Sequence, residues 1–222
     1  SGGVTIANGG GNTRMYQLGA VTNTLVNGTL TKSNFGTGTI SIGANGSTAS
    51  AQLAITSANT TIYNAMVINA ASYPDGGLGA LRFDSTGNQL HGTITAGASD
   101  ISLSSGGTGS VTAYGQLTGT NGLQLKAPTT AFTLTLNNTV NAANDYSGNT
   151  TISANTILAL GAANQIANGV GKGNLIINSG TFAMGSFSDT INGLEGNGTI
   201  DGNGSTLTVG DNNTTSTFSG VM

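Results

Sequence analysis

The chain of 222 residues contains no cysteine, no tryptophan and very little charge. Only 6% of its residues are charged, far below the roughly 25% of an average soluble domain. Without cysteine there is no disulfide framework, and the one histidine, His91, is not enough for a zinc site. Five scattered Lys and Arg residues do not neutralise a run of phosphates, so we expect no nucleic-acid partner.

Long apolar runs and helical patterns are also missing. No stretch approaches the roughly 20 apolar residues that span a bilayer, so we expect no membrane insertion by this segment. Thr, Asn, Ser and Gly dominate the sequence, and they are poor residues for a helix interior. In the best helical window, 158–167, the apolar residues are mostly alanine and Gly161 interrupts the pattern, so we expect a loop or a single turn there.

What the chain does contain is a series of short segments in which apolar and hydroxyl residues alternate. Segments 101–103, 132–136 and 207–209 show this pattern, which is typical of strands with one buried face. Many such segments end at Asn-Gly or Asp-Gly pairs, which favour turns with positive φ. The sequence therefore predicts an all-β fold of short strands.

Two all-β architectures fit this pattern: a sandwich of hairpins, which Asn-Gly turns favour, and a β-solenoid of stacked coils. Aromatic residues make up only 5% of the chain, which suits a narrow aliphatic core. Coils of about 20 to 24 residues would give about 9 to 11 coils. Segment 27–32 also aligns with 121–126 without gaps, and 39–42 then falls on 133–136. These observations predict a parallel β-solenoid with a large internal repeat.

A family resemblance supports the same fold. Segment 144–161 reads Asn-Asp-Tyr-Ser-Gly-Asn-Thr-Thr-Ile-Ser-Ala-Asn-Thr-Ile-Leu-Ala-Leu-Gly. It resembles the autotransporter-associated β-strand repeat, whose pattern runs Asn-x-Tyr-Ser/Thr-Gly-Gly-Thr-Thr, then Ser/Asn-Ala-Gly-Thr-Leu, then Leu-Gly. Asn149 and Asn155 stand where that pattern usually has glycine, which alters two turns but not the alternation.

Segments 190–200, 207–210 and 218–221 resemble the rest of that unit. The resemblance covers 114–222 well and is looser over 1–113. We expect 1–222 to form a single solenoid segment that consists of these two regions. It implies a right-handed parallel β-helix in the passenger of a secreted bacterial surface protein. Its implied location is extracellular, at the bacterial cell surface, and its implied partners are further repeats of the same chain.

Known metal motifs are incomplete. The glycine-rich segments 76–80 and 106–110 resemble the start of the calcium-binding nonapeptide, but neither is followed by the aspartate that would hold the ion. A looser calcium site using Asp75, Asp84 or Asp100 remains an alternative. We expect no cofactor.

Catalytic arrangements are also missing. A lone His91, most simply a surface or turn residue, and the lack of a Gly-x-Ser-x-Gly elbow argue against a Ser–His–Asp enzyme. Asp189, Glu195 and Asp201 are spaced by six residues, which is not a coil length, so we expect them on different faces as solvated turn acids. A polysaccharide-cleaving β-helix is therefore the least favoured alternative.

Two functional hypotheses remain for a chain that we expect not to be an enzyme. The first is a structural stalk or filament segment that projects from a surface and self-associates. The second is an adhesin module that binds a glycan or a host protein through 72–82, where Tyr73 and Asp75 interrupt the strand pattern and Arg82 follows. We expect Arg82 and Asp84, on the same face of a strand, to form a weak surface ion pair.

Overall fold

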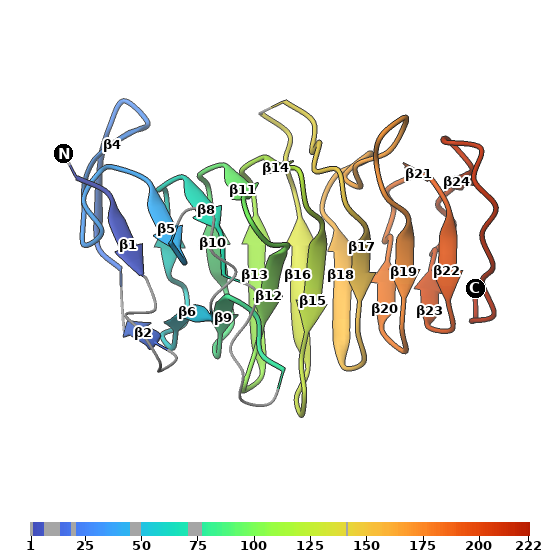
Figure 1. Cartoon of the computed structure of the whole chain (residues 1–222), viewed down its shortest axis with the longest axis horizontal. Helices are drawn as coiled ribbons and strands as arrows, with labels where there is room; N and C mark the ends of the chain where they lie inside the picture. The colour runs from blue at the N-terminus through green and yellow to red at the C-terminus, as the bar shows by residue number, and fades with distance from the viewer. Residues whose placement is uncertain (1, 7–13, 19–20, 45–49, 71–76, 141) are drawn as a thin grey trace.

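The computed structural model describes residues 2–6, 14–18, 21–44, 50–70, 77–140 and 142–222. Within these ranges the regular structure is entirely β-strand. The strands lie side by side along one long axis, with the N-terminus at one end and the C-terminus at the other (Figure 1). In the same ranges no helix is long and apolar enough to cross a membrane.

Three parallel sheets form the sides of the stack. The five-stranded sheet contains β1 (Val4–Ile6), β5 (Ile40–Ile42), β8 (Met66–Ile68), β11 (Ile94–Ala96) and β14 (Leu117–Gly119). The eight-stranded sheet contains β2 (Arg14–Leu18), β6 (Ala51–Ile55), β9 (Leu81–Phe83), β12 (Ile101–Ser104), β15 (Leu123–Lys126), β17 (Thr150–Ile152), β19 (Leu175–Ile177) and β22 (Leu194–Gly196). The seven-stranded sheet contains β7 (Thr61–Ile62), β10 (Asn88–Leu90), β13 (Gly109–Ala113), β16 (Phe132–Leu136), β18 (Thr156–Leu160), β20 (Thr181–Ala183) and β23 (Thr199–Asp201). Near the C-terminus, β21 (Asp189–Ile191) pairs in parallel with β24 (Leu207–Val209).

The chain visits these sheets in a fixed order. It passes through β11, β12 and β13 and then through β14, β15 and β16, so each strand lies beside the matching strand of the next coil. Leu103 of β12 pairs with Leu125 of β15, and Leu134 of β16 pairs with Leu158 of β18, all in parallel register. The predicted β-solenoid is thus confirmed, and the alternative sandwich of hairpins is wrong.

The predicted number of coils is too high. The chain makes about six turns, and its longest sheet has eight strands, against the 9 to 11 coils expected. Coil length varies more than a uniform repeat allows. The first coil, from Val4 to its partner Ile40, is nearly twice as long as a late one, from Leu175 to its partner Leu194.

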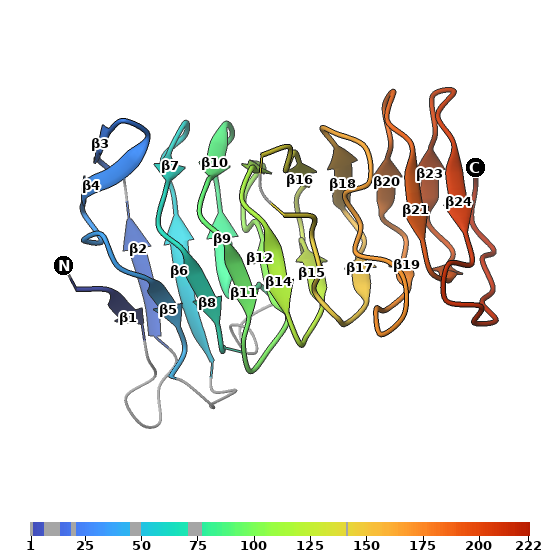
Figure 2. The ribbon, with the colours of Figure 1, turned by 90° about the horizontal axis from the view of Figure 1, so that it is seen from above.

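One antiparallel hairpin interrupts the pattern. It consists of β3 (Asn23–Val26) and β4 (Thr29–Ser33) and lies at the N-terminal end of the stack, beside β2 and β7 (Figure 2). Asn27 and Gly28 at its tip have φ of 50° and 77°, as a two-residue hairpin turn requires. Lys32 therefore lies in a hairpin, whereas Lys126 ends a strand of a parallel sheet, so the predicted equivalence of 27–32 and 121–126 is wrong.

The core is a narrow column between the sheets. It consists largely of stacked aliphatic residues, with four large aromatic side chains, Phe83, Phe132, Tyr146 and Phe182, fully buried among them. Thr156–Leu160 is strand β18, whose alternate residues point into this column, so the loop expected from residue 158 onward is wrong for its first three residues. Alternation over so few residues is hard to recognise in a sequence, which is why the strand was not predicted. Packing against the neighbouring coils decides the local structure there.

Candidate functional site

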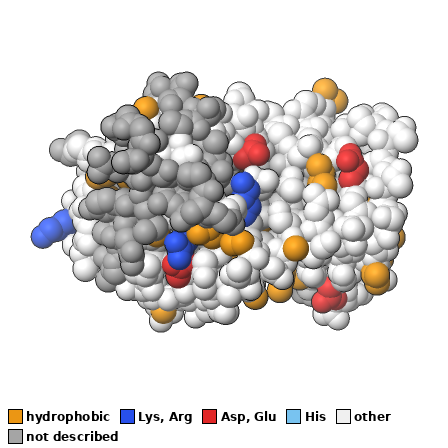
Figure 3. All heavy atoms as spheres, turned by 60° about the horizontal axis from the view of Figure 1, so that its bottom comes forward, with side chains coloured by type: hydrophobic (Ala, Val, Ile, Leu, Met, Phe, Trp, Pro, Cys, Tyr) orange, Lys and Arg blue, Asp and Glu red, His pale blue; other side chains and the backbone are white. Residues whose placement is uncertain are grey.

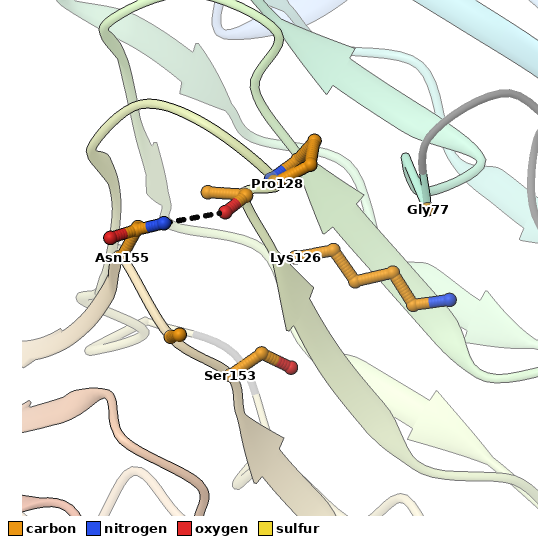
Figure 4. Close-up of a pocket in the computed structure, with 7 residues that line it drawn as sticks. Gly77, Lys126, Pro128, Ser153 and Asn155 are labelled. Atoms are coloured by element: carbon orange, nitrogen blue, oxygen red, sulfur yellow. Dashed lines mark hydrogen bonds between the residues drawn. The ribbon is translucent and has the colours of Figure 1, made fainter.

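A groove follows the corner between the eight-stranded and seven-stranded sheets. Its first part has a volume of about 370 Å³ and is lined by Lys126, Pro128, Ser153 and Asn155 among others (Figure 4). Its second part has a volume of about 290 Å³ and is lined by Ala131, by 155–157 and by 179–181 of the next coil. Asn155 lines both parts, so they adjoin each other along the solenoid axis, and the Asn155 Nδ2 donates a hydrogen bond to the carbonyl of Ala127 at 3.2 Å (Figure 4).

Unequal turn lengths create this groove. The turn between β15 and β16 comprises residues 127–131, whereas the turns between β17 and β18 and between β19 and β20 comprise only 153–155 and 178–180. The longer turn extends beyond the next ones at the lower edge of Figure 1, so it forms a wall, and the short turns form the floor. Asn155 and Ser179 adopt left-handed φ of 60° and 58° in these tight turns. This is the conformation that glycine favours, which agrees with the glycine of the repeat pattern at position 155.

Lys126 is the charged residue of the groove. It ends β15, and its side chain extends toward the side of Gly77, away from Asn155 (Figure 4). The side chain is about half buried, and this burial lowers the pKa of the ammonium group, while Asp100 partly opposes the shift. Among the described residues we find no hydrogen bond or ion pair of the Lys126 ammonium group. The groove therefore holds a partly desolvated cation.

Arg82, one of the predicted ligand contacts, lies in the same row of the eight-stranded sheet. It pairs with Ser104, which in turn pairs with Lys126. Its guanidinium group binds Asp84 through two contacts, Nη2 to Oδ2 at 2.7 Å and Nε to Oδ1 at 2.8 Å. The predicted ion pair is thus confirmed, and it is bidentate rather than loose. The Nη2 and Nε donors of the guanidinium group therefore point to Asp84 and not to the groove.

The other predicted contacts, Tyr73 and Asp75, lie outside the described residues. Asp75 also belonged to the looser calcium site, together with Asp84 and Asp100. Asp84 binds Arg82, and Asp100 Oδ1 accepts a hydrogen bond from the Gly122 N–H at 2.7 Å. Across the described part of the chain, no three His, Asp or Glu side chains come close enough to hold a metal ion.

His91 belongs to an aromatic stack. Its ring lies between those of Tyr63 and Tyr114, with 4.7 Å between ring centroids on each side. Burial lowers the pKa of the imidazole, and Nε2 contacts Gln89 Oε1 at 3.1 Å. The three rings follow β7, β10 and β13 directly, so paired strands place them in one row. Sequence reasoning missed this row because the coils that separate its members differ in length.

The three evenly spaced acids lie on three different strands, as predicted. Asp189 is in β21, Glu195 in β22 and Asp201 in β23, so they do not converge on one face. Asp201 is exposed, but Asp189 is only 2% exposed, so the prediction of a solvated acid is wrong for Asp189. Its carboxylate accepts hydrogen bonds from the N–H groups of Gln165 at 2.9 Å and Thr190 at 2.8 Å. Burial raises its pKa to about 6, although these bonds oppose the shift.

The surface carries few other charged groups. On the face shown in Figure 3, outside the grey atoms, Lys, Arg, Asp and Glu side chains are scattered among uncharged residues. The fold and this surface define the class of the protein as a parallel β-solenoid. No known protein family, curated protein or solved structure matches the chain.

Proposed function

We propose that this β-solenoid is a structural segment of a stalk or filament at the surface of a bacterium, and that it is not an enzyme. The observation that carries the proposal is a set of buried asparagines at the corners, whose side chains join neighbouring coils. Such bonds supplement the backbone ladders and make each coil depend on the next one, as a rod that resists unfolding requires.

Each of these asparagines satisfies backbone groups of another coil. They are Asn64, Asn69, Asn88 and Asn192, all at most 3% exposed. The Nδ2 of Asn64 donates to the carbonyls of Gly36 at 3.0 Å and Gly38 at 2.8 Å. The Oδ1 of Asn88 accepts from the Thr60 N–H at 3.0 Å. Because polar groups at these corners are buried, each bond also avoids the cost of an unpaired group, about 1 to 3 kcal/mol.

The extracellular location is proposed from two observations. One is the resemblance of 144–161 to a repeat of secreted surface proteins. The other is the scarcity of sites for trypsin-like proteases, because the chain has five Lys and Arg residues, of which Arg82 is held by Asp84 and Lys126 is half buried. A rod with few accessible cleavage sites suits an environment that contains proteases.

Self-association or continuation of the stack is part of the same proposal. In the last described coil, Val209 and Val221 are 46% and 66% exposed. A further coil of the same kind, from the same chain or from a second copy, would bury these side chains and pair with the outer strand edges. Sedimentation at increasing concentration tests the second-copy form of the proposal, for which a rising mean mass is expected.

Limited proteolysis tests the structural role. We expect trypsin to leave the native chain largely intact for hours, whereas the heat-unfolded chain is cut at its Lys and Arg residues within minutes. Rapid cleavage of the native chain after Arg82 would contradict a rigid stack, because Arg82 is the middle residue of β9, which pairs with β6 and β12 inside the eight-stranded sheet.

Labelling of cells tests the location. Antibodies raised against the folded chain should bind intact cells of the bacterium that produces it, and protease treatment of those cells should remove the signal. Labelling that needs permeabilised cells would refute a surface location.

A further inference from the structure

In the groove at the corner between the eight-stranded and seven-stranded sheets, the polar lining residues are one lysine and several uncharged residues that form hydrogen bonds. Besides Lys126, its polar lining residues include Ser153, Asn155, Ser179 and Thr181. The Asn155 Nδ2 already donates to the carbonyl of Ala127 at 3.2 Å, and the Ser179 hydroxyl donates to Asn197 Oδ1 at 3.4 Å, so these two side chains offer a ligand their oxygen atoms as acceptors. Among the described residues, no carboxylate lines either part of it. This lining offers donors and acceptors to a ligand that is rich in hydroxyl groups, together with one positive charge.

The shape of the groove favours an extended ligand. The groove crosses three successive coils, from the turn after β15 to the turn after β19, which at about 4.8 Å per coil corresponds to roughly 10 Å between its outer turns. Its two parts, of about 370 Å³ and about 290 Å³, together fall within the usual range of ligand sites, about 300 to 1,000 Å³.

A sugar chain fits this groove better than a peptide does. A peptide that binds by strand addition needs a free sheet edge, but β17 and β18 beside the floor are each paired on both sides. Among the described residues, the lining contains no aromatic side chain to anchor a peptide, and Ile157 is its one large aliphatic residue. Its small apolar surfaces, Ala127, Pro128 and Ala154, suit the C–H faces of sugar rings, while its hydroxyl and amide groups suit sugar hydroxyls.

The charge of the groove indicates that the sugar is acidic. A half-buried ammonium group loses part of its hydration, and a carboxylate of the ligand would replace it with a charge-assisted hydrogen bond. We propose that the groove binds an acidic oligosaccharide along the solenoid axis, with a uronate carboxylate on Lys126 and sugar hydroxyls on Ser153, Asn155 and Ser179. This binding is separate from the structural role and does not depend on it.

The test uses tetragalacturonate as the probe, titrated against the intact chain by calorimetry and NMR. Maltotetraose serves as the neutral control, and tetraglutamate as the acidic control without sugar rings. We expect binding of tetragalacturonate that weakens with salt, and at least tenfold weaker binding of the other two. No binding of tetragalacturonate, or equal binding of either control, would overturn the proposal.

Two variants locate the site. Lys126→Met removes the ammonium group, and Lys172→Met removes one charge from the loop between β18 and β19, outside both parts of the groove, as a control. We expect at least a tenfold loss of affinity for Lys126→Met and no loss for Lys172→Met. Equal losses would show attraction to net charge alone and would overturn the site.

The variant Asn155→Gly tests the path of the ligand along the groove. Glycine keeps the left-handed turn at φ 60° while the carboxamide is removed, and thermal unfolding would show that the fold is retained. We expect about a threefold to tenfold loss of affinity for tetragalacturonate, because Asn155 lines both parts of the groove and its Nδ2 also holds the carbonyl of Ala127. Unchanged binding would overturn the proposed course of the sugar chain.

Discussion

Replacement of Asn192 by alanine is the sharpest test of the idea that corner asparagines join the coils. Asn192 is 1% exposed, and its side chain makes three hydrogen bonds to the preceding coil. Its Oδ1 accepts from the Gly169 N–H at 2.8 Å, and its Nδ2 donates to the carbonyls of Gly169 at 3.0 Å and Lys172 at 2.8 Å. Alanine leaves these three backbone groups without a partner from residue 192.

The expected destabilisation follows from these bonds. At a net value of about 1 kcal/mol per bond, Asn192→Ala should lower the free energy of unfolding by about 2 to 4 kcal/mol. The matched control is Asn178→Ala, which changes an exposed asparagine in a turn of the same stack and should change stability by less than about 0.5 kcal/mol.

Urea unfolding followed by circular dichroism and by tyrosine fluorescence measures both variants. Because stacked coils do not always unfold together, the two signals should be compared before a single free energy is fitted. A loss below about 1 kcal/mol for Asn192→Ala, or an equal loss for Asn178→Ala, would refute the reasoning, since the buried bonds would then contribute little.

Three further predictions concern buried groups. The folded-state pKa of Asp189, about 6, lies above its ordinary value of 3.8, so its stabilising contribution is full below 3.8 and is lost as pH rises through 6. Stability should therefore rise by about 2 kcal/mol between pH 7.5 and pH 4 in the wild type relative to Asp189→Asn, and parallel urea-midpoint profiles would contradict this. Gly92→Ala should cost more than about 2 kcal/mol, because its Cβ would lie 2.1 Å from the carbonyl oxygen of Asn64, whereas Gly202→Ala has room and should cost under about 0.5 kcal/mol in the same assay. The imidazole of His91 should titrate by NMR below 6.5, and a higher midpoint would contradict its desolvation in the aromatic stack.

Alternation predicted the strands well where it was regular. Segments 101–103, 132–136 and 207–209 correspond to β12, β16 and β24, because one inward face per strand leaves a clear pattern of period two. The predicted number of coils and the predicted equivalence of 27–32 and 121–126 were both wrong, because alternation does not reveal what happens at the corners. Corner insertions carry no hydrophobic pattern, and an Asn-Gly pair forms a hairpin tip at 27–28 but not at 121–122.

The burial of polar residues could also not be predicted from the sequence. Asp189 looked like a surface acid because its neighbours in sequence are Ser188 and Thr190, yet the backbone of Gln165 from the preceding coil covers it. Which residues meet across coils depends on coil length, and that length changes from coil to coil. Such partners can be identified only from the strand register in the structure.

The same variation in coil length explains how a uniform rod acquires a distinct surface. If every turn had the length of 153–155, the corner would be a smooth ridge without walls. The two additional residues of the turn 127–131 raise one wall above the next coils, and Lys126 lies at its base. Shortening the turn to three residues should therefore abolish binding of tetragalacturonate while the solenoid stays folded, because turns of that length already occur in the next two coils. A shortened chain that still binds would show that the wall has no part in recognition.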